Sequence, residues 1–106
     1  MTNLRDREKA FENMFAHDQE MKFRAEARRN KLLGQWAAER LGKTGEAAEA
    51  YAREVVAADF EEAGDEDVFR KIRADFDAGN VAISDEELRT KMLDLLAIAV
   101  EQVKGA

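Results

Sequence analysis

Residues 15–42, FAHDQEMKFRAEARRNKLLGQWAAERLG, join a charge-rich stretch to an apolar one with no proline between them. Toward the end of this stretch apolar side chains recur at helical spacing, at Leu32, Leu33, Trp36, Ala37 and Leu41. Gly42 then supplies a helix stop signal. The stretch therefore predicts one long helix whose second half enters a core, with Trp36 as an anchor. Gly34 within it favours close approach of another helix over a hinge.

The composition of the whole chain agrees with a helical fold. Its 106 residues include no proline and six glycines, and the common residues are mostly good helix formers. A chain of this length supports one domain with a modest core. We therefore expect an all-α, small four-helix bundle with a long first helix and a flexible N-terminal segment.

Three further helices are predicted from periodicity and punctuation. The second begins near Thr44 and ends at Gly64, and the third begins with Asp65 as its N-cap and stops at Gly79. The last has the clearest start, because Ser84 and Glu87 have the spacing of a capping box. Each segment carries apolar residues at helical spacing, namely Ala48, Tyr51, Ala52, Val55, Val56 and Phe60 in the second, Val68, Phe69, Ile72 and Phe76 in the third, and Leu88, Met92, Leu95, Leu96, Ala99 and Val103 in the last.

Charged residues are unevenly distributed along the chain. Residues 1–43 hold ten Lys and Arg against seven Asp and Glu, whereas residues 44–106 hold seven against sixteen. The basic excess includes Arg24, Arg28, Arg29 and Lys31, and the acidic excess includes Asp59, Glu61, Glu62, Asp65, Glu66 and Asp67. We expect these two clusters to meet within the fold.

The N-terminal third has a broken apolar seam, because charged residues fall beside its apolar stripe. We therefore divide the chain into residues 1–18, disordered or fraying when free and helical on a partner, and a bundle of residues 19–106. The alternative is that Phe11 and Phe15 pack onto the bundle. A helix that enters a protein cleft needs apolar anchors and charges that fix its register. The candidate partner-binding residues are Leu4, Arg5, Arg7, Glu8, Phe11, Met14 and Phe15.

Several runs of the chain together resemble the signature of one known family. They are residues 15–18 (FAHD), 20–21 (EM), 25–34 (AEARRNKLLG), 36–39 (WAAE), 41–45 (LGKTG) and 59–64 (DFEEAG). The family is the zeta inhibitor subunit of bacterial F-type ATP synthases. The resemblance covers essentially the whole chain in order and with few gaps, and it is weakest over residues 69–86, which cannot be matched residue by residue.

This resemblance implies a four-helix protein that inhibits ATP hydrolysis by the F-type ATP synthase. Its N-terminal segment would insert as a helix at a catalytic interface between the large alternating subunits, beside the rotor, and block rotation in the hydrolytic direction. The partner would be the catalytic sector of that enzyme. From the residues alone, a helical adaptor that binds another protein through the same segment is an equal alternative.

Catalysis and cofactor binding find little support in the sequence. The chain has one histidine, one serine and no cysteine, so it lacks the residues of the common nucleophilic devices. We expect no enzyme and no cofactor. His17 with Glu20 and Met21 offers too few ligands for a metal. Residues 75–86 imitate a calcium loop, but glycine stands at the fifth position and not at the sixth, so we predict a helix end and no metal site.

The expected partners are proteins. The chain has a net charge of −6, and acids interrupt the basic patch, which argues against nucleic acid. The first residues, MTNLRDREKAF, are too charged for a secretory signal, and no stretch reaches the length of about 18 apolar residues that a membrane span needs. We therefore expect a cytoplasmic protein, monomeric when free, without direct membrane insertion and peripheral to the membrane through the ATP synthase.

Overall fold

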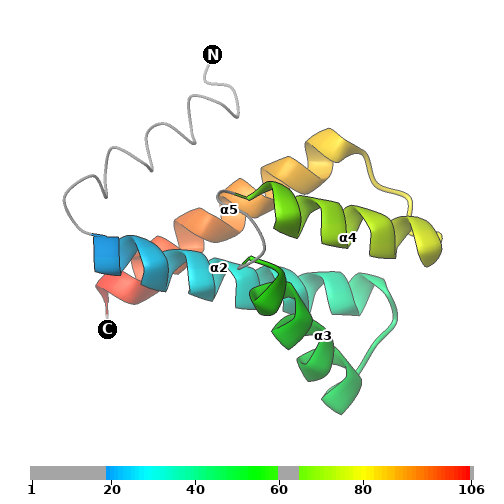
Figure 1. Ribbon diagram of the computed structural model, residues 1–106, viewed down its shortest axis with the longest axis horizontal. Coiled ribbons are helices and arrows are strands. Elements are labelled where there is room, and N and C mark those ends of the chain that lie inside the picture. Colours follow the sequence, from blue (N-terminus) through cyan, green and yellow to red (C-terminus); the bar gives the residue numbers. More distant parts are fainter. Residues whose placement is uncertain (1–18, 60–64, 106) are drawn as a thin grey trace.

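The computed structural model describes residues 19–59 and 65–105, and all of its regular structure in these ranges is helical (Figure 1). The predicted all-α fold class is therefore confirmed. The elements are α2 (Gln19–Arg40), α3 (Gly45–Ala58), α4 (Glu66–Ala78) and α5 (Asp85–Lys104).

Helix α2 is the long central element of the fold. It packs most extensively against α3 and α5, and α4 lies against α3 and α5 (Figure 1). The start of α2 lies beside the end of α5, so these two helices run antiparallel. Because α2 contacts every other described helix, residues spread along its length can reach all parts of the bundle.

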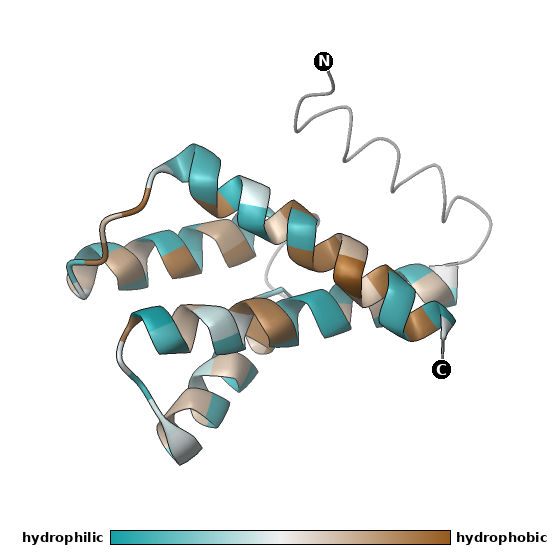
Figure 2. Cartoon of the chain, turned by 180° about the vertical axis from the view of Figure 1, so that it is seen from behind, coloured by the Kyte–Doolittle hydropathy of each residue, from teal (hydrophilic) through white to brown (hydrophobic). Residues whose placement is uncertain are grey.

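The core contains the apolar stripes that the sequence predicts. Figure 2 shows hydrophobic and hydrophilic residues alternating along the helices, as expected when one face of each helix is buried. Leu33 of α2, Val55 of α3, Ile72 and Phe76 of α4 and Leu88 of α5 are fully buried in one cluster. A smaller cluster around Ala25 and Val100 extends the contact between α2 and α5.

Trp36 occupies a different place from the predicted one. It is half-buried at the edge of the core, where its ring packs edge-to-face on Phe76 with 5.5 Å between ring centroids. Phe76 fills the centre of the core and has no exposed surface. The expectation of Trp36 as a core anchor is therefore wrong in part, because Trp36 packs against the core but is only partly buried.

One predicted helix end and the expected role of one cap residue differ in the structure. Helix α3 ends at Ala58 with Asp59 as its C-cap, which is earlier than the predicted end at Gly64, and residues 60–64 lie outside the described ranges. Asp65 is the N-cap of α4, as predicted, but its side chain does not cap the helix. It accepts a hydrogen bond from Arg29 of α2.

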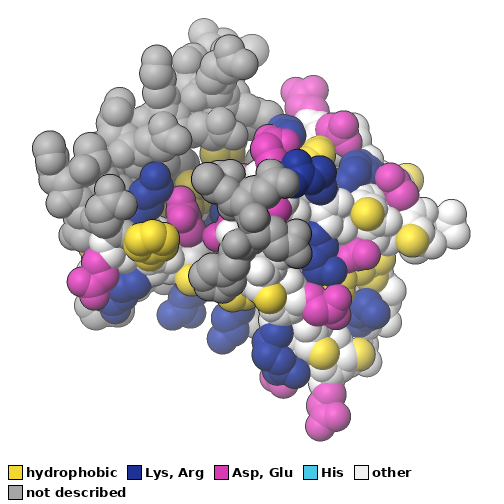
Figure 3. All heavy atoms as spheres, in the orientation of Figure 1, with side chains coloured by type: hydrophobic (Ala, Val, Ile, Leu, Met, Phe, Trp, Pro, Cys, Tyr) yellow, Lys and Arg dark blue, Asp and Glu magenta, His cyan; other side chains and the backbone are white. Residues whose placement is uncertain are grey.

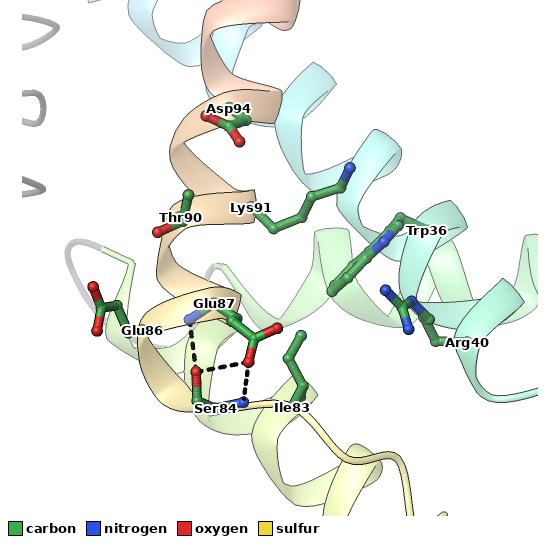
Figure 4. A pocket seen from close by; sticks show the side chains of 9 residues that line it. All are labelled: Trp36, Arg40, Ile83, Ser84, Glu86, Glu87, Thr90, Lys91 and Asp94. Carbon is green, nitrogen blue, oxygen red and sulfur yellow. Dashed lines mark hydrogen bonds between the residues drawn. The ribbon is translucent and has the colours of Figure 1, made fainter.

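The start of α5 confirms the predicted capping box. The Glu87 backbone N–H donates to Ser84 Oγ at 3.1 Å, and the Ser84 backbone N–H donates to Glu87 Oε1 at 3.4 Å. These two bonds satisfy N–H groups that have no partner within the helix. They fix the point at which α5 begins, below Trp36 in Figure 4.

Gly34 lies where α2 crosses α3. A Cβ atom at this position would stand 2.6 Å from the Cα of Ala52, which is closer than real Cβ contacts come. The prediction of close helix approach at Gly34 is confirmed, because only a residue without a side chain lets α3 approach α2 this closely.

Candidate functional site

The candidate residues for partner binding all lie before Gln19, outside the described residues. They are Leu4, Arg5, Arg7, Glu8, Phe11, Met14 and Phe15. Their role and the boundary between residues 18 and 19 stay predictions. The structure describes the helical bundle that begins with α2. Two polar features of the bundle are a buried ionic junction around Arg29 and an aromatic cleft around Trp36.

The ionic junction is built around Arg29, whose side chain is 1% exposed. Its Nε donates to Asn30 Oδ1 at 2.7 Å, and its Nη2 donates to Asp65 Oδ1 at 2.8 Å. Asn30, equally buried, in turn donates a side-chain hydrogen bond to the carboxylate of Asp59. Asp59 and Asp65 flank the connection between α3 and α4, so both ends of that connection are held to the same turn of α2.

Carboxylates outnumber cations at this junction. Burial is the main cause that raises the pKa of Glu26 above its ordinary value, and the charge of Asp65 adds to it. Burial likewise raises the pKa of Asp59, although the hydrogen bond from Asn30 and the charge of Arg29 oppose the rise. The folded chain therefore binds protons at Glu26 and Asp59 more tightly than the unfolded chain does.

Replacing Glu26 with glutamine is expected to stabilise the protein at neutral pH. A carboxyl group with a raised folded-state pKa contributes stability below its unfolded pKa, and this contribution is lost as the pH rises through the folded pKa. At pH 7 the ionised Glu26 side chain therefore lowers the free energy of unfolding. We put this effect at roughly 0.5 kcal/mol, because the group is half-exposed and partly screened by solvent. Urea denaturation at neutral pH and near pH 4 measures the difference, which should shrink in acid.

The control for this variant is Glu49→Gln, which removes an exposed carboxylate from the middle of α3. Its effect on the free energy of unfolding should be the same at both pH values, whereas the effect of Glu26→Gln should shrink in acid. A Glu26→Gln protein less stable than the parent at neutral pH would show that the attraction of Glu26 to Arg29 and Lys22 outweighs its burial.

The predicted meeting of the basic and acidic clusters is confirmed for one pair only. Arg29 joins Asp65 at 2.8 Å, whereas Arg24, Arg28 and Lys31 are exposed and make no ion pair within the described ranges. On the face shown in Figure 3, several basic side chains lie along the lower left edge, and basic and acidic side chains are interspersed over the right-hand part of the described surface. Asn30 was not among the predicted site residues, although its position next to Arg29 on the apolar side of the predicted helix indicated a buried partner.

The first two acidic side chains of residues 75–86, the stretch that imitates a calcium loop, are bonded to other side chains of the fold. Asp75 accepts hydrogen bonds from Tyr51 Oη at 2.7 Å and from Lys71 Nζ at 3.1 Å, and Asp77 pairs with Arg73 at 2.7 Å. Burial and the bond to Asp75 raise the pKa of Tyr51. In residues 19–59 and 65–105, no three His, Cys, Asp or Glu side chains are grouped to hold a metal ion. This region is a helix end, with Asn80 in the left-handed conformation (φ 59°).

The aromatic cleft lies between α2 and the first half of α5 and has a volume of about 360 Å³. Trp36 and Lys91 point toward each other across it, and Arg40 lies beside the indole (Figure 4). The Lys91 Nζ and the Arg40 Cζ each stand 5.6 Å from the centroid of the Trp36 ring. Both cations thus make cation–π contacts with one side chain, and Ile83 adds an apolar wall.

None of the helices in the described ranges is long and apolar enough to cross a membrane.

Comparison with known proteins identifies the family. A protein-family model described as ATPase inhibitor subunit zeta matches residues 1–102. A protein solved by solution NMR is 54% identical in sequence with a TM-score of 0.71, and the similarity covers 80% of this chain and 96% of that chain. Comparison with curated proteins gives no significant match. Because the family model spans nearly all of the sequence, from the N-terminal segment through α5, the chain belongs to the ATPase inhibitor subunit zeta family.

Proposed function

We propose that this protein inhibits ATP hydrolysis by an F-type ATP synthase through its N-terminal segment. In this proposal residues 1–18 insert as a helix at a catalytic interface between the large alternating subunits, beside the rotor, and block rotation in the hydrolytic direction. The bundle of residues 19–106 stays outside. The protein would act as a monomer in the cytoplasm and reach the membrane only through the enzyme.

The observation that carries the proposal is the family match, which begins at residue 1 and so includes the whole N-terminal segment. The bundle supports it in a different way. Its buried arginine and most of the charged residues of α4 are engaged in pairs within the fold, as Arg29–Asp65 and Arg73–Asp77 illustrate. Side chains engaged in these internal pairs are less available for a contact with the enzyme, which favours the segment before Gln19 as the inhibitory surface.

Removing residues 1–15 is expected to abolish inhibition while the bundle stays folded. The experiment titrates the full-length chain and the truncated chain into the purified catalytic sector of the cognate ATP synthase, freed of its own inhibitor, and follows ATP hydrolysis. Circular dichroism and thermal melting of the truncated chain provide the control for folding. Inhibition by both chains would place the active surface on the bundle, and inhibition by neither would direct attention to an adaptor role.

A double substitution tests which residues of the segment act. Phe11→Ala with Phe15→Ala is expected to weaken inhibition without lowering the melting temperature, because aromatic anchors dominate the energy of a helix bound in a cleft. The charge variant Arg5→Ala with Arg7→Ala is the comparison, and it should mainly slow association. A large loss of stability in the aromatic variant would show instead that these rings belong to the core.

A further inference from the structure

Three of the four cations in the basic cluster of α2 take no part in holding the fold together. Arg29 is buried and pairs with Asp65. Arg24, Arg28 and Lys31 are exposed and form no ion pair with another described residue. Residues three and four positions apart lie on one face of a helix, so these three side chains line the same outer face of α2. Figure 3 shows several basic side chains along the lower left edge of the molecule, on the side where α2 begins in Figure 1.

An exposed aromatic ring lies beside these cations. Phe23 is 68% exposed, which is more than Ile98 of α5, the other large hydrophobic side chain that the described chain exposes. It stands four positions before Ala27, which is also exposed, and eight before Lys31, so it lies in line with Lys31 along the helix. One exposed ring needs no explanation by itself, but phenylalanine and arginine are both enriched in protein–protein interfaces. We refer to these neighbouring side chains as the basic face of α2, namely Phe23, Arg24, Arg28 and Lys31.

Cations outnumber acids on the basic face and in the groove that continues it. Before Lys31, the exposed acid on α2 is Glu20, because Glu26 is partly buried at the junction around Arg29. Lys31 also lines the groove between α2 and α3, which has a volume of about 520 Å³ and contains one further cation and one acid. The charged side chains of this surface are therefore the cations Arg24, Arg28, Lys31 and Arg53 and the acids Glu20 and Glu49. A partner surface with carboxylates complements this charge.

We propose that the basic face of α2 is a second contact with the enzyme that the N-terminal segment inhibits, and that it binds an acidic surface of that enzyme's catalytic sector. This inference rests on the proposed inhibitory role. Helix α2 follows residue 18 directly, and Phe23 lies about 6 Å along the helix axis from Gln19, at about 1.5 Å per residue. A partner that holds residues 1–18 therefore lies within reach of the basic face. Its carboxylates would accept hydrogen bonds from the arginines, and an apolar side chain would cover Phe23.

An anionic membrane or a nucleic acid fits this face less well. Both are dense polyanions, and they would meet the net charge of −6 of the chain and the acids Glu20 and Glu49 of this surface. A protein surface presents separate carboxylates and apolar side chains, which suit separate arginines and one aromatic ring.

The test measures the binding of full-length chains to the immobilised catalytic sector by biolayer interferometry, with ATP hydrolysis followed in parallel. Arg24→Gln with Arg28→Gln is expected to slow association about tenfold at low ionic strength, because charges at the border of an interface act mainly on association. Lys43→Gln with Lys104→Gln removes the same charge from exposed positions outside the basic face and should leave association within about twofold. High salt should abolish the difference between the two double variants. Both should still inhibit fully at saturation, since residues 1–18 are unchanged.

Phe23→Ala tests the apolar part of the contact. It is expected to speed dissociation from the catalytic sector about fivefold, because a buried aromatic side chain acts mainly on dissociation. Ile98→Ala, at the other exposed hydrophobic position, is the control and should leave dissociation within about twofold.

The outcomes separate this contact from the inhibitory role. Equal association of the two double variants, with a parent chain that inhibits, would overturn the contact and leave the inhibitory role intact. A parent chain that neither binds nor inhibits would overturn both. Vesicles that contain phosphatidylserine are the probe for a membrane. Binding of the parent chain to these vesicles that is lost in Arg24→Gln with Arg28→Gln, while association with the catalytic sector is unchanged, would assign the basic face to a lipid surface and overturn the proposal.

Discussion

Replacing Arg29 with alanine is expected to lower the free energy of unfolding by about 3 kcal/mol, one of the two largest losses that we predict for a single substitution. Arg29 is buried and bonds to both Asn30 and Asp65. Without the guanidinium, Asp59 and Asp65 lose their main neutralising charge, and a buried volume is left empty. Asp65 is partly exposed and regains some hydration, which keeps the loss at the lower end of the range for broken buried pairs.

The loss should depend on pH in a defined direction. The charge of Arg29 lowers the pKa of both Glu26 and Asp59, so its removal raises these two pKa values further. Carboxyl groups with raised folded-state pKa values destabilise the fold when they are ionised, that is, above their folded-state pKa. The alanine variant should therefore be most impaired at neutral pH and recover part of its stability as the pH falls toward the ordinary range of carboxyl groups, about 4.

Urea denaturation of the parent and the variant at both pH values measures this effect. Arg28→Ala is the control, because Arg28 is the exposed neighbour on the same helix and its loss should cost less than about 0.5 kcal/mol. A double-mutant cycle with Asp65→Asn isolates the pair itself. If Arg29→Ala is as stable as Arg28→Ala, the junction does not hold the connection between α3 and α4 to α2.

The limits of prediction from sequence are visible at this same junction. The capping box of Ser84 and Glu87 and the apolar stripes of α4 and α5 depend on residues a few positions apart, so the sequence contains them directly. The bond between Arg29 and Asp65 joins residues 36 positions apart. Burial of an arginine is also rare, so the residues alone do not mark Arg29 as the buried member of its cluster. Charge asymmetry between the halves predicted that opposite clusters meet, but not which pair.

Trp36 shows a different limit. Spacing places a large aromatic residue on the apolar side of a helix, but it does not show how the ring divides between core and solvent. That division depends on Phe76, which is fully buried beneath it, and on Arg40 and Lys91, whose cationic groups lie over the indole ring. The cleft is formed by three elements of the chain, and no local pattern predicts it. The candidate residues of the N-terminal segment, by contrast, are testable only with the partner enzyme.

Replacing Gly34 with alanine is expected to lower the free energy of unfolding by about 2 kcal/mol, although alanine is the better helix former. At an exposed helical position, replacing glycine with alanine would raise the free energy of unfolding by about 1 kcal/mol. Here the new methyl group would stand 2.6 Å from Ala52 Cα and 3.3 Å from Ala52 O. These are backbone atoms that cannot rotate away, so α3 must move from α2. Overpacking of this kind typically costs about 1–3 kcal/mol, and occasionally more.

Two further variants distinguish this steric effect from helix propensity. Ala27→Gly, at an exposed position of the same helix, should lose about 1 kcal/mol, which establishes the ordinary sign of the exchange in α2. Adding Ala52→Gly to Gly34→Ala removes the 3.1 Å contact with Ala52 Cβ but not the closer one with Ala52 Cα. After the cost of Ala52→Gly alone is subtracted, the double variant should therefore restore less than half of the loss. Urea denaturation measures the parent and these four variants. A more stable Gly34→Ala protein would mean that α2 and α3 have room to separate, and that the glycine serves flexibility and not close packing.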